Sequence, residues 1–401
     1  MKPTLFGYGL TTKAIAKKLG GGCTFFDDSC KETYTDENQN TIKPSHLFNP
    51  EESQLEVTTP SLKPNHPLIL SAKNLLSEYD YFAKEMPFSI WISGTNGKTT
   101  TTQMLTHLLE KKGALSGGNI GTPLAELATN APIWVLESSS FTLHHTRVAS
   151  ANIYLLLPIT PDHLDWHGTK EAYSEDKLRP LLNMKEGELA LIPKGLKVPK
   201  THAYVVEYDS DDFLCDYFNL DASKLDYKGA FLQDALLSLA ITKVLFDETD
   251  YDLLNRFKRD AHRQEEFYDA QNRLWVNDSK ATNLDATIQA VKGYADKHIH
   301  LILGGDDKGV DLSPLFEEMK PLTLTLYTIG ANNDKLLSLS KEYAIHTIES
   351  KTIASAINNI ASTLDNSSVA LLSPAAASFD QFKSYKHRGE TFMEIVKNLK
   401  K

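Results

Sequence analysis

The stretch that decides the fold of this chain reads Ile90-Trp91-Ile92-Ser93-Gly94-Thr95-Asn96-Gly97-Lys98-Thr99-Thr100. It begins with an apolar run typical of a buried strand, continues through a turn with two glycines, and ends where a helical pattern begins. In such a loop the glycines let successive backbone N–H groups turn inward around phosphate oxygens, and the helix N-terminus adds positive potential. We therefore expect a nucleotide phosphate site in which Lys98 reaches the outer phosphates and the Thr99 hydroxyl ligates Mg²⁺.

The loop is a variant of the general phosphate-loop pattern, which places a glycine five residues before Gly97, where this chain has Ile92. An ordinary Gly-Asn turn would explain the glycines alone. It would not explain why a strand, the pair Lys98-Thr99 and a helical pattern reaching Lys112 coincide. The pattern therefore favours a nucleotide loop.

Three parts of the chain alternate short apolar runs with helical patterns, which is typical of parallel sheets covered by helices. The clearest predicted strands are Thr4–Phe6, Ile90–Ile92, Ile133–Leu136, Tyr154–Leu157, Leu274–Val276, His300–Leu303, Leu324–Tyr327 and Val369–Leu372. A chain of 401 residues also exceeds what one hydrophobic core usually serves. We therefore predict an α/β protein with two or three domains.

Composition places the chain among globular proteins, because hydrophobic residues make up 41% and charged residues 23% of it. No apolar run approaches the roughly 18 residues that would span a bilayer, and the first residues lack the apolar core of a secretion signal. We therefore expect a cytoplasmic protein without membrane insertion. The net charge of −10 and the lack of a basic block argue against nucleic acid as a partner. Cys23, Cys30 and Cys215 lack metal-type spacing, so we expect reduced, structural thiols.

Polar residues follow two strands of the central part at the point where each strand ends. Glu137 comes directly after the run Ile133–Leu136, and His163 follows the strand that ends at Leu157. Ligands of open parallel sheets collect at these carboxyl ends, and an acid beside a phosphate loop commonly serves Mg²⁺. Taken alone, however, His163 is more typical of a hydrogen-bonded loop histidine.

Other basic side chains of the central part carry little signal by themselves. Lys177 lies in a helical pattern, where an exposed lysine is the ordinary interpretation. His144 and His145 receive no functional role. Only the neighbouring motifs change the interpretation of Lys177.

The C-terminal part carries three polar clusters, each after a predicted strand: Asn277–Asn283, Gly304–Gly309 and Ser373–Ser378. Because carboxyl ends of parallel strands meet at one edge of a sheet, we expect the clusters to converge there. Ordinary turn chemistry explains their glycines and prolines but not their repeated Lys, Asp and hydroxyl content. We interpret them as candidate ligand-binding loops.

The loop Gly94–Thr100 resembles the nucleotide loop of the Mur ligases and folylpolyglutamate synthases. Further motifs resemble the Mur ligase family in the family's own order: Gly117–Pro123, Glu137–Phe141, Thr160–His163, Tyr173 with Lys177–Arg179, His262-Arg263, Asn277–Asn283, Gly304–Gly309 and Ser373–Gly389. The resemblance extends from residue 5 to about residue 390. A series of ordered motifs is much more specific than any one of them.

The resemblance implies an α/β fold of three domains. These are an N-terminal Rossmann-like domain for a UDP-sugar at residues 1–82, a central P-loop ATPase-type domain with a mostly parallel sheet at 83–260, and a C-terminal Rossmann-like domain at 261–401 that closes over the site and binds D-glutamate. It also implies an ATP-dependent ligase that joins D-glutamate to UDP-N-acetylmuramoyl-L-alanine through an acyl phosphate. Such an enzyme serves peptidoglycan synthesis, and with it cell shape and division, as a cytoplasmic monomer.

The resemblance also assigns site residues, position by position. For ATP they are Gly94, Thr95, Asn96, Gly97, Lys98, Thr99, Thr100, Arg263, Asn277, Asp278 and Lys280. For one or two Mg²⁺ ions they are Thr99, Glu137, His163 and Lys177, of which Lys177 matches a lysine that the family carbamylates. Lys98, His163 and Lys177 form the implied catalytic set. For the UDP-sugar they are Leu10, Thr11, Asp27, Ser29 and Asn119, and for D-glutamate Thr282, Lys308, Ser378, Phe379 and Tyr385.

Some segments depart from the family pattern. Thr12 stands where a third glycine of the N-terminal turn is often found, and Thr59-Pro60-Ser61 replaces a Ser-Pro-Gly turn. The segment Lys228–Ala235 lacks the family's His and Asn residues. Either Gln233 or Asp234 takes over their nucleotide contacts, or the adenine pocket is rearranged, so this departure bears on nucleotide affinity.

Several alternatives stay open. Folylpolyglutamate synthases also add glutamate with ATP, although their loop more often ends Gly-Lys-Gly-Ser. The diaminopimelate- or lysine-adding Mur enzymes normally carry an Asp-Asn-Pro-Arg type motif, which this chain lacks. A nucleotide-gated switch would give no role to Lys308 or Thr282. A catalytically inactive family member would explain the lost Asn motif but not the retention of Lys98, Glu137 and His163.

Overall fold

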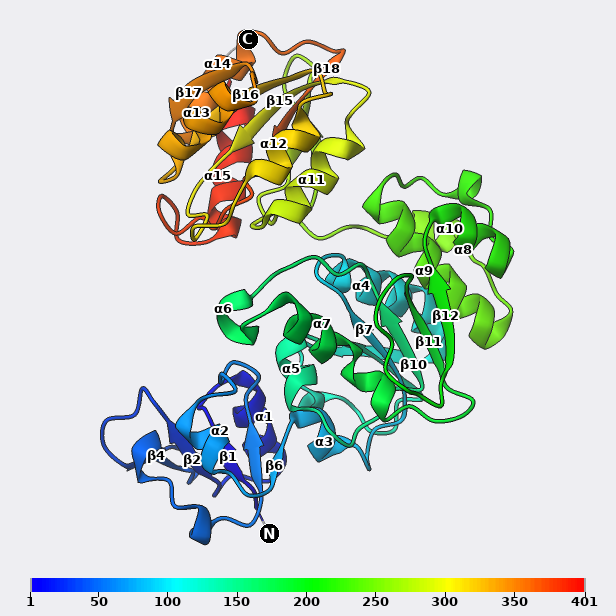
Figure 1. Ribbon diagram of the computed structural model, residues 1–401, viewed down its shortest axis with the longest axis vertical. Helices are drawn as coiled ribbons and strands as arrows, with labels where there is room; N and C mark the ends of the chain where they lie inside the picture. The colour runs from blue at the N-terminus through cyan, green and yellow to red at the C-terminus, as the bar shows by residue number, and fades with distance from the viewer. Residues whose placement is uncertain (1, 400–401) are drawn as a thin grey trace. The chain divides into compact units, whose positions relative to one another are not determined.

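The computed structural model of the protein describes residues 2–399 (Figure 1). The chain divides into two compact units. The first comprises residues up to 227 together with 231–257, and the second comprises 228–230 and the residues from 258 onward. Within the described residues, the first unit holds two six-stranded sheets and the second unit holds one. No helix among residues 2–399 is long and apolar enough to cross a membrane.

The N-terminal sheet has the strand order β3-β4-β2-β1-β5-β6, parallel except for the pair β3 and β4. Its elements are β1 Thr4–Phe6, α1 Leu10–Lys18, β2 Thr24–Asp27, β3 Tyr34–Thr35, β4 Thr41–Pro44, β5 Glu56–Thr58, α2 Pro67–Ser71, β6 Leu75–Leu76 and α3 Glu78–Phe82. Alternate strand residues face opposite sides. Leu5 and Phe25 pack with Ile15 of α1, whereas Phe6 and Phe26 belong to a separate cluster on the other face.

The central sheet is parallel throughout, with the order β12-β11-β10-β7-β9-β8. Its strands are β7 Phe88–Ser93, β8 Ala114–Gly118, β9 Ile133–Glu137, β10 Ile153–Leu156, β11 Leu189–Pro193 and β12 Tyr204–Tyr208. Its helices are α4 Lys98–Leu109, α5 Ser140–His145, α6 Leu164–His167, α7 Lys170–Leu178, α8 Asp211–Phe218, α9 Ala230–Phe246 and α10 Tyr251–Asn255. Helices cover both faces, so the strands are apolar on both sides. Trp91 and Trp134 face one core, and Ile92 and Val135 face another that includes Leu105 of α4.

The N-terminal and central sheets share one hydrophobic core, which explains why they form one unit. The ring of Tyr79, on α3, lies 4.7 Å from that of Trp91 on β7, in an edge-to-face arrangement. Phe25 and Leu136, from the two different sheets, belong to the same buried cluster. Large buried aromatic side chains therefore join the two sheets.

The third sheet has the order β13-β14-β18-β15-β16-β17 and is parallel except for the edge strand β13. Its elements are β13 Glu265–Tyr268, β14 Leu274–Asn277, α11 Leu284–Gly293, β15 His298–Leu303, α12 Ser313–Met319, β16 Leu324–Ile329, α13 Asn333–Glu342, β17 Thr347–Lys351, α14 Ile353–Ala361, β18 Ser368–Leu372 and α15 Tyr385–Lys397. Separate clusters cover its two faces. One contains Leu301 and Phe316, and the other contains Ile302 and Ile357.

The predicted α/β class with mostly parallel sheets is confirmed. Each strand predicted from the sequence is present, with ends that differ by at most a few residues. The helix expected to reach Lys112 is α-helical to Leu109, and a 3₁₀ turn completes it from Glu110 to Lys112. The domain boundaries after residues 82 and 260 stay predictions.

Candidate functional site

The loop between β7 and α4 requires glycine at two positions. Gly94 has φ +146°, and a Cβ there would lie 2.5 Å from Leu157 Cβ. Gly97 has φ +79° and precedes the first residue of α4, and a Cβ there would lie 2.7 Å from Asp234 Oδ1. Residues with a Cβ rarely adopt these angles, and both positions are crowded. The backbone N–H groups that begin α4 therefore stand in the arrangement that binds phosphate.

Side chains from neighbouring segments hold this loop in place. Thr95 Oγ1 donates to the carbonyl of Thr160 at 2.9 Å and lies 3.0 Å from the hydroxyl of Tyr173. Lys98 Nζ donates to the carbonyls of Gly94 at 2.9 Å and Thr95 at 2.6 Å. The loop is thus fixed by contacts to the strand ends beside it, and the Lys98 ammonium lies over the loop's own backbone.

Asp234 is the side chain that fills the space beside Gly97. It lies near the beginning of α9, in the segment that departs from the family pattern, and only 6% of it is exposed. Its carboxylate approaches the Cα of Gly97 closely enough to exclude a Cβ. Of the two residues suggested to replace the missing Asn contacts, Asp234 therefore lies at the nucleotide loop.

Glu137 is the last residue of β9 and is 3% exposed. Its Oε1 accepts a hydrogen bond of 2.7 Å from Asn119 Nδ2. Its Oε2 is buried and has no hydrogen-bond partner among the described residues. A buried carboxylate oxygen without a partner is unfavourable, and a cation is the ligand that would satisfy it.

His163 precedes α6 in the left-handed region, with φ +52°. Its ring packs edge-on against Phe141, 4.8 Å between centroids. The side chain of His163 is 49% exposed. Its partial burial lowers the pKa of His163, the nearby Asp162 raises it, and the ammonium groups of Lys98 and Lys177 lower it further. A neutral imidazole is the form that ligates a metal ion.

Lys177 is buried on α7, with 1% exposed, although an isolated helix lysine would be expected at the surface. Its Nζ donates to the carbonyl of Gly94 at 2.7 Å and lies 3.4 Å from Ser93 Oγ. Burial lowers the pKa of Lys177 well below its ordinary value, and the charge of Lys98 lowers it further. A neutral amine is a nucleophile, which an ammonium is not.

The structure therefore brings Lys98, Glu137, His163 and Lys177 to one edge of the central sheet. Lys98 and Lys177 both donate to the carbonyl of Gly94, Glu137 ends the strand beside β7, and His163 follows β10. No group of three or more His, Cys, Asp or Glu side chains within residues 2–399 could hold a metal ion. The predicted set does not need such a group, because it combines one Glu and one His with Thr99 and Lys177. The Glu137 oxygen without a hydrogen-bond partner and the His163 ring, whose pKa is lowered, fit a divalent cation.

The predicted UDP-sugar residues lie at the carboxyl ends of two adjacent strands, except for Asn119. Asp27 ends β2, and its Oδ2 accepts from the backbone N–H of Tyr8 at 2.6 Å in the glycine turn after β1. Its Oδ1 accepts from the backbone N–H of Ser29 at 2.8 Å. Leu10, which begins α1, is 62% exposed, and Thr11 follows it. Asn119 lies instead beside Glu137.

In the second unit, the predicted nucleotide residues Asn277 and Asp278 are buried. Asp278 Oδ2 accepts from Ser373 Oγ at 2.8 Å, and its Oδ1 accepts from the backbone N–H of Gln264 at 3.2 Å. Burial raises the pKa of Asp278 to about 7. Lys280 lies over the ring of Tyr385, 4.2 Å from its centroid, whereas Arg263 is half-buried.

The three polar loops of the second unit converge. Asp306 and Ala377 exchange two backbone hydrogen bonds of 3.0 and 2.9 Å, which join the second loop to the third. Arg388, which the sequence reasoning did not identify, is 1% exposed and joins the first loop to the third. Its guanidinium donates to Ser279 Oγ and to the carbonyls of Ser279, Ala376 and Ala377 at 2.9 to 3.4 Å.

The predicted D-glutamate residues on these loops differ in exposure. Ser378 is buried, Tyr385 is half-buried, and Thr282 and Lys308 are exposed. Lys308 has φ +51°, and its backbone N–H donates to Asp306 Oδ1 at 3.0 Å. Phe379 is 73% exposed. The loops are thus firmly joined at their bases, while several of their ligand-binding candidates face solvent.

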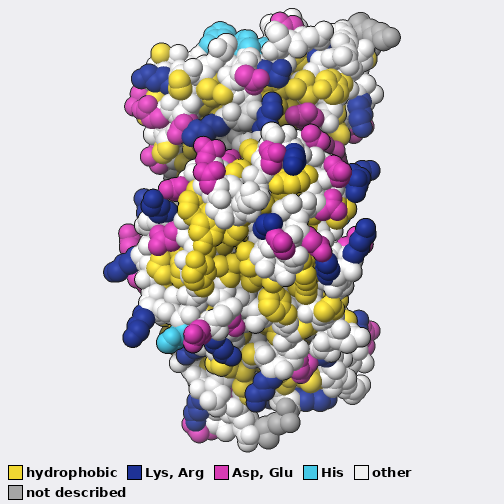
Figure 2. All heavy atoms as spheres, turned by 90° about the vertical axis from the view of Figure 1, so that its right-hand side faces the viewer, with side chains coloured by type: hydrophobic (Ala, Val, Ile, Leu, Met, Phe, Trp, Pro, Cys, Tyr) yellow, Lys and Arg dark blue, Asp and Glu magenta, His cyan; other side chains and the backbone are white. Residues whose placement is uncertain are grey.

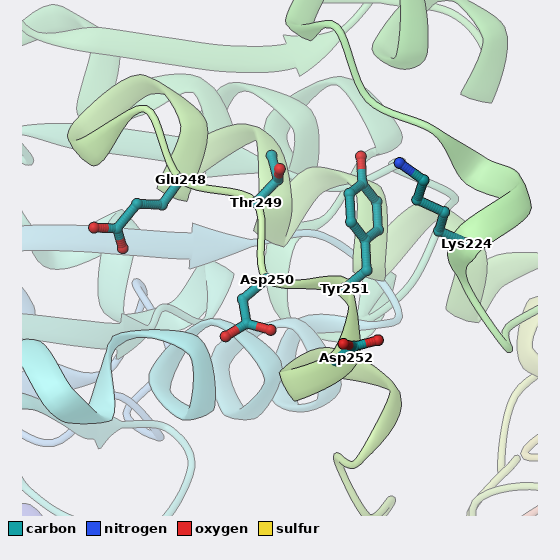
Figure 3. A pocket seen from close by; sticks show the side chains of 6 residues that line it. All are labelled: Lys224, Glu248, Thr249, Asp250, Tyr251 and Asp252. Atoms are coloured by element: carbon teal, nitrogen blue, oxygen red, sulfur yellow. The ribbon is translucent and has the colours of Figure 1, made fainter.

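The molecular surface shows two further features. Hydrophobic side chains gather in the middle of the face shown in Figure 2, between interspersed charges of both signs. A surface hollow of about 720 Å³ is lined by Lys224, Glu248, Thr249, Asp250, Tyr251 and Asp252 (Figure 3). It contains none of the predicted site residues, so it takes no part in the site described above.

Comparisons with known proteins agree with this architecture. The family model "Mur ligase middle domain" matches residues 92–217. A Campylobacter jejuni protein named UDP-N-acetylmuramoylalanine--D-glutamate ligase is 49% identical over 100% of both chains, and a Helicobacter pylori protein of the same name is 44% identical over 99% of both. The crystal structure of a MurF ligase from Thermotoga maritima in complex with ADP has a TM-score of 0.60 at 16% identity, covering 99% of this chain and 97% of that one. At that identity the last likeness concerns the fold alone.

Proposed function

The chain belongs to the Mur ligase family, and we propose from this premise that it joins D-glutamate to UDP-N-acetylmuramoyl-L-alanine with cleavage of ATP, in peptidoglycan precursor synthesis. The observation that carries the proposal is the identity of 44 to 49% to ligases of that name over essentially the whole chain. The nucleotide loop, with its two conformationally required glycines and Lys98, supplies the ATP site that this reaction needs.

The chemistry proceeds in two displacements. A carboxylate oxygen of the UDP-sugar substrate attacks the γ-phosphorus, so that an O–P bond forms and ADP leaves. The amine of D-glutamate then attacks the acyl carbon, the tetrahedral intermediate expels inorganic phosphate, and the amine loses a proton. Negative charges must approach each other in the first step. The Lys98 ammonium, which already lies over the loop backbone, offsets this repulsion.

Mg²⁺ is proposed as the cofactor, and when bound it neutralises charge between the phosphates and the attacking carboxylate. Glu137 Oε2, the imidazole of His163 and the hydroxyl of Thr99 would hold it. Lys177 contributes as a carbamate, which forms when its amine attacks CO₂ and loses a proton. Support for this comes from the burial of Lys177, which favours the neutral amine, and from the unpaired oxygen of Glu137.

The remaining contacts divide between the two units. Leu10, Thr11, Asp27 and Ser29 bind the uridine diphosphate, and Asn119 binds the muramoyl end. The nucleotide is bound by the loop Gly94–Thr100 and also by Arg263, Asn277, Asp278 and Lys280. Asp234 takes a place in the nucleotide site that an Asn fills in relatives, and its contact with Gly97 supports this.

D-Glutamate is bound by the converging loops of the second unit through Thr282, Lys308, Ser378, Phe379 and Tyr385. An exposed Lys308 is suited to pair with a carboxylate. We further propose that the chain acts as a monomer in the cytoplasm and that its second unit closes over the first during the reaction. Closure would exclude water from the acyl phosphate, which would otherwise hydrolyse.

Phosphate release from ATP, with Mg²⁺ and UDP-N-acetylmuramoyl-L-alanine present, tests the proposal. D-Glutamate, L-glutamate, meso-diaminopimelate and L-lysine are compared as acceptors. We expect turnover with D-glutamate alone. Turnover with another amino acid would overturn the substrate, and phosphate release that does not depend on any acceptor would overturn ligation while leaving ATP hydrolysis.

A further inference from the structure

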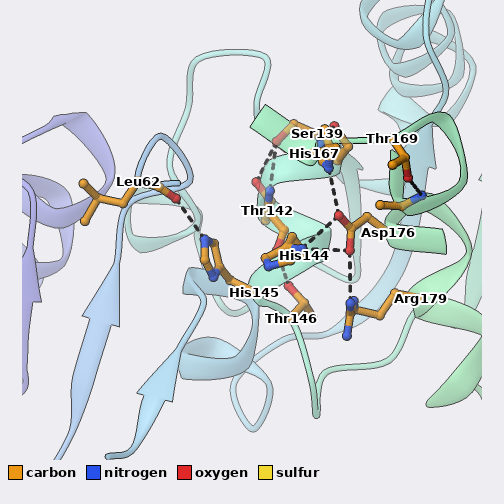
Figure 4. Close-up of polar contacts among 12 residues, drawn as sticks. Leu62, Ser139, Thr142, His144, His145, Thr146, His167, Thr169, Asp176 and Arg179 are labelled. Atoms are coloured by element: carbon orange, nitrogen blue, oxygen red, sulfur yellow. Dashed lines mark hydrogen bonds and ion pairs between the residues drawn. The ribbon is translucent and has the colours of Figure 1, made fainter. Parts of the chain in front are cut away.

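A buried carboxylate beside Lys177 joins three helices of the first unit. Asp176 lies on α7, and its side chain is 5% exposed. It accepts hydrogen bonds from His144 Nδ1 on α5 at 2.9 Å, from His167 Nδ1 on α6 at 2.8 Å and from Arg179 Nη2 at 3.0 Å (Figure 4). Both oxygens are therefore occupied by donors from neighbouring segments.

The network continues from His167 to a serine. His167 Nε2 lies 3.0 Å from Ser140 Oγ, so Ser140, His167 and Asp176 have the connectivity of a nucleophilic triad. A nucleophilic role is excluded by burial, because Ser140 is 3% exposed and the His167 side chain 0%. In the neutral ring, Nδ1 donates to Asp176, which leaves Nε2 to accept from the serine hydroxyl. The hydrogen bonds to Asp176 and Ser140 therefore fix the orientation of the His167 ring.

Aromatic packing further immobilises His167. The ring of Phe141 stacks on it with 5.5 Å between centroids and 10° between planes, and the ring of Tyr173 meets it edge-on at 5.1 Å. Phe141 also contacts the ring of His163. The network and the predicted metal-associated histidine thus pack against the same aromatic side chain.

The three helices that Asp176 joins are those connected to the predicted metal-binding residues. α5 begins three residues after Glu137, α6 follows His163 directly, and α7 carries Lys177 next to Asp176 itself. These residues come from three separate segments, and packing alone permits small shifts of one short helix past another. A carboxylate on α7 that accepts from donors on α5 and α6 removes that freedom, because moving any of the three helices leaves a buried charge with fewer donors.

We propose that Asp176 is a positioning residue, which holds Glu137, His163 and Lys177 in the relative places that a divalent cation requires. It acts through His167, His144 and Arg179 and does not touch the cation. The inference rests on the metal role given to these residues in the proposed function. Outer partners that orient metal ligands typically change metal affinity about 10- to 100-fold when they are removed.

The test is a titration of the full-length protein with Mn²⁺ in the presence of ADP, followed by electron paramagnetic resonance. We expect Asp176→Asn to raise the Mn²⁺ dissociation constant about tenfold or more, since the amide cannot accept from all three donors. The milder His144→Gln, which leaves two of the donors in place, is expected to raise it about threefold. His144 is 28% exposed, so that variant serves if Asp176→Asn does not fold.

Asp269→Asn is the matched control. Asp269, in the second unit, is 2% exposed and accepts from Arg273 Nε at 2.8 Å and Trp275 Nε1 at 2.9 Å, so it resembles Asp176 in burial and in the kind of its partners. We expect it to lower the thermal stability while leaving the Mn²⁺ dissociation constant unchanged. An equal loss of Mn²⁺ affinity in this control would overturn the inference.

Two other outcomes would also overturn it. One is unchanged Mn²⁺ affinity in both Asp176→Asn and His144→Gln, and the other is a wild-type protein that binds no Mn²⁺ with ADP. Ligation of D-glutamate by the same wild-type preparation, measured in parallel, separates these failures from a failure of the proposed function. If ligation persists, the function stands and only the positioning role falls.

Discussion

The two lysines with proposed roles in the two units are held in opposite ways. Lys177 in the first unit is 1% exposed, and its amine donates to the carbonyl of Gly94 and lies over the ring of Tyr173. Lys308 in the second unit is exposed on a turn, at a positive φ. Burial lowers the pKa of Lys177 well below its ordinary value, which favours the neutral amine, the form suited to covalent change. An exposed amine end like that of Lys308 is suited to an ion pair with a substrate.

The contacts that hold the segments of the two sites together also differ. A network of ionisable side chains around Asp176 connects the segments of the first site. The loops of the second site are joined through backbone carbonyls, by Arg388 and by the bridge between Asp306 and Ala377. In the proposed function, this difference suits the first site to chemistry at fixed positions and the second to substrate binding by side chains on loops with a rigid base.

The largest effect is expected from Lys177→Ala. Loss of the buried amine removes the carbamate that would help hold Mg²⁺, so we expect kcat for phosphate release to fall about 10³-fold. Lys170→Ala, an exposed lysine on the same helix, is the control and should match the wild type. If Lys177→Ala keeps kcat within tenfold of the wild type, the catalytic role proposed for the buried amine is contradicted.

Arg388→Met tests the support of the second site. The change leaves several buried carbonyls without donors, so we expect the free energy of unfolding of the second unit to fall by about 3 kcal/mol. Urea unfolding with hydrogen exchange at residues 277–281 measures it. Lys397→Met, at an exposed position of the same helix α15, should change it by less than about 0.5 kcal/mol. Equal effects of both variants would contradict the structural role of Arg388.

Lys308→Ala tests whether the exposed lysine serves substrate binding, in contrast to the catalytic role proposed for Lys177. We expect the KM for D-glutamate to rise about 100-fold with little change in kcat, because a charge-assisted hydrogen bond to a carboxylate contributes about 2 to 3 kcal/mol. Steady-state kinetics with varied D-glutamate measure both constants. Lys320→Ala, exposed at the end of α12, serves as the control. A fall in kcat at unchanged KM would instead place Lys308 with the reacting groups.

The pH dependence of stability distinguishes the two buried aspartates. Burial raises the pKa of Asp278 to about 7, so its contribution to stability is present at low pH and is lost as pH rises through that value. Burial would also raise the pKa of Asp176, but hydrogen bonds from His144 and His167 hold it far below its usual range, so Asp176 adds no slope above pH 5.

We therefore expect the second unit to lose roughly 2 kcal/mol of stability between pH 5 and 7, a loss that Asp278→Asn abolishes. Urea unfolding at the two pH values measures it. The same slope in the wild type and in Asp278→Asn would assign it to another group. Asp176→Asn is the complementary control, since it should leave the slope unchanged.

The fold and much of the nucleotide site could be predicted from the sequence because they depend on local patterns. The run Ile90–Ile92, the glycines at 94 and 97 and the apolar positions of α4 specify a strand, a turn and a helix within about twenty residues. The strands were found for the same reason. The resemblance placed Lys98, Glu137, His163 and Lys177, and the structure brings them to one sheet edge.

The supporting residues could not be predicted. His144 received no role, and neither did Asp176, His167 or Arg388, because each acts through partners distant in sequence. Asp176 and His144 are separated by 32 residues, and Arg388 and Ser279 by 109. A charged side chain looks exposed in any sequence, and only the surrounding core shows that it is buried and paired.

The sequence by itself determined the α/β class, the order of the strands along the chain and the nucleotide loop, since hydrophobic periodicity and glycine conformations are local properties. Only the tertiary structure decided which ionisable groups are buried and which partners they have. The surrounding structure therefore lowers the pKa values of Lys177 and Asp176 and raises the pKa of Asp278. Desolvation and pairing depend on everything that packs around a group, so they arise only when distant segments meet.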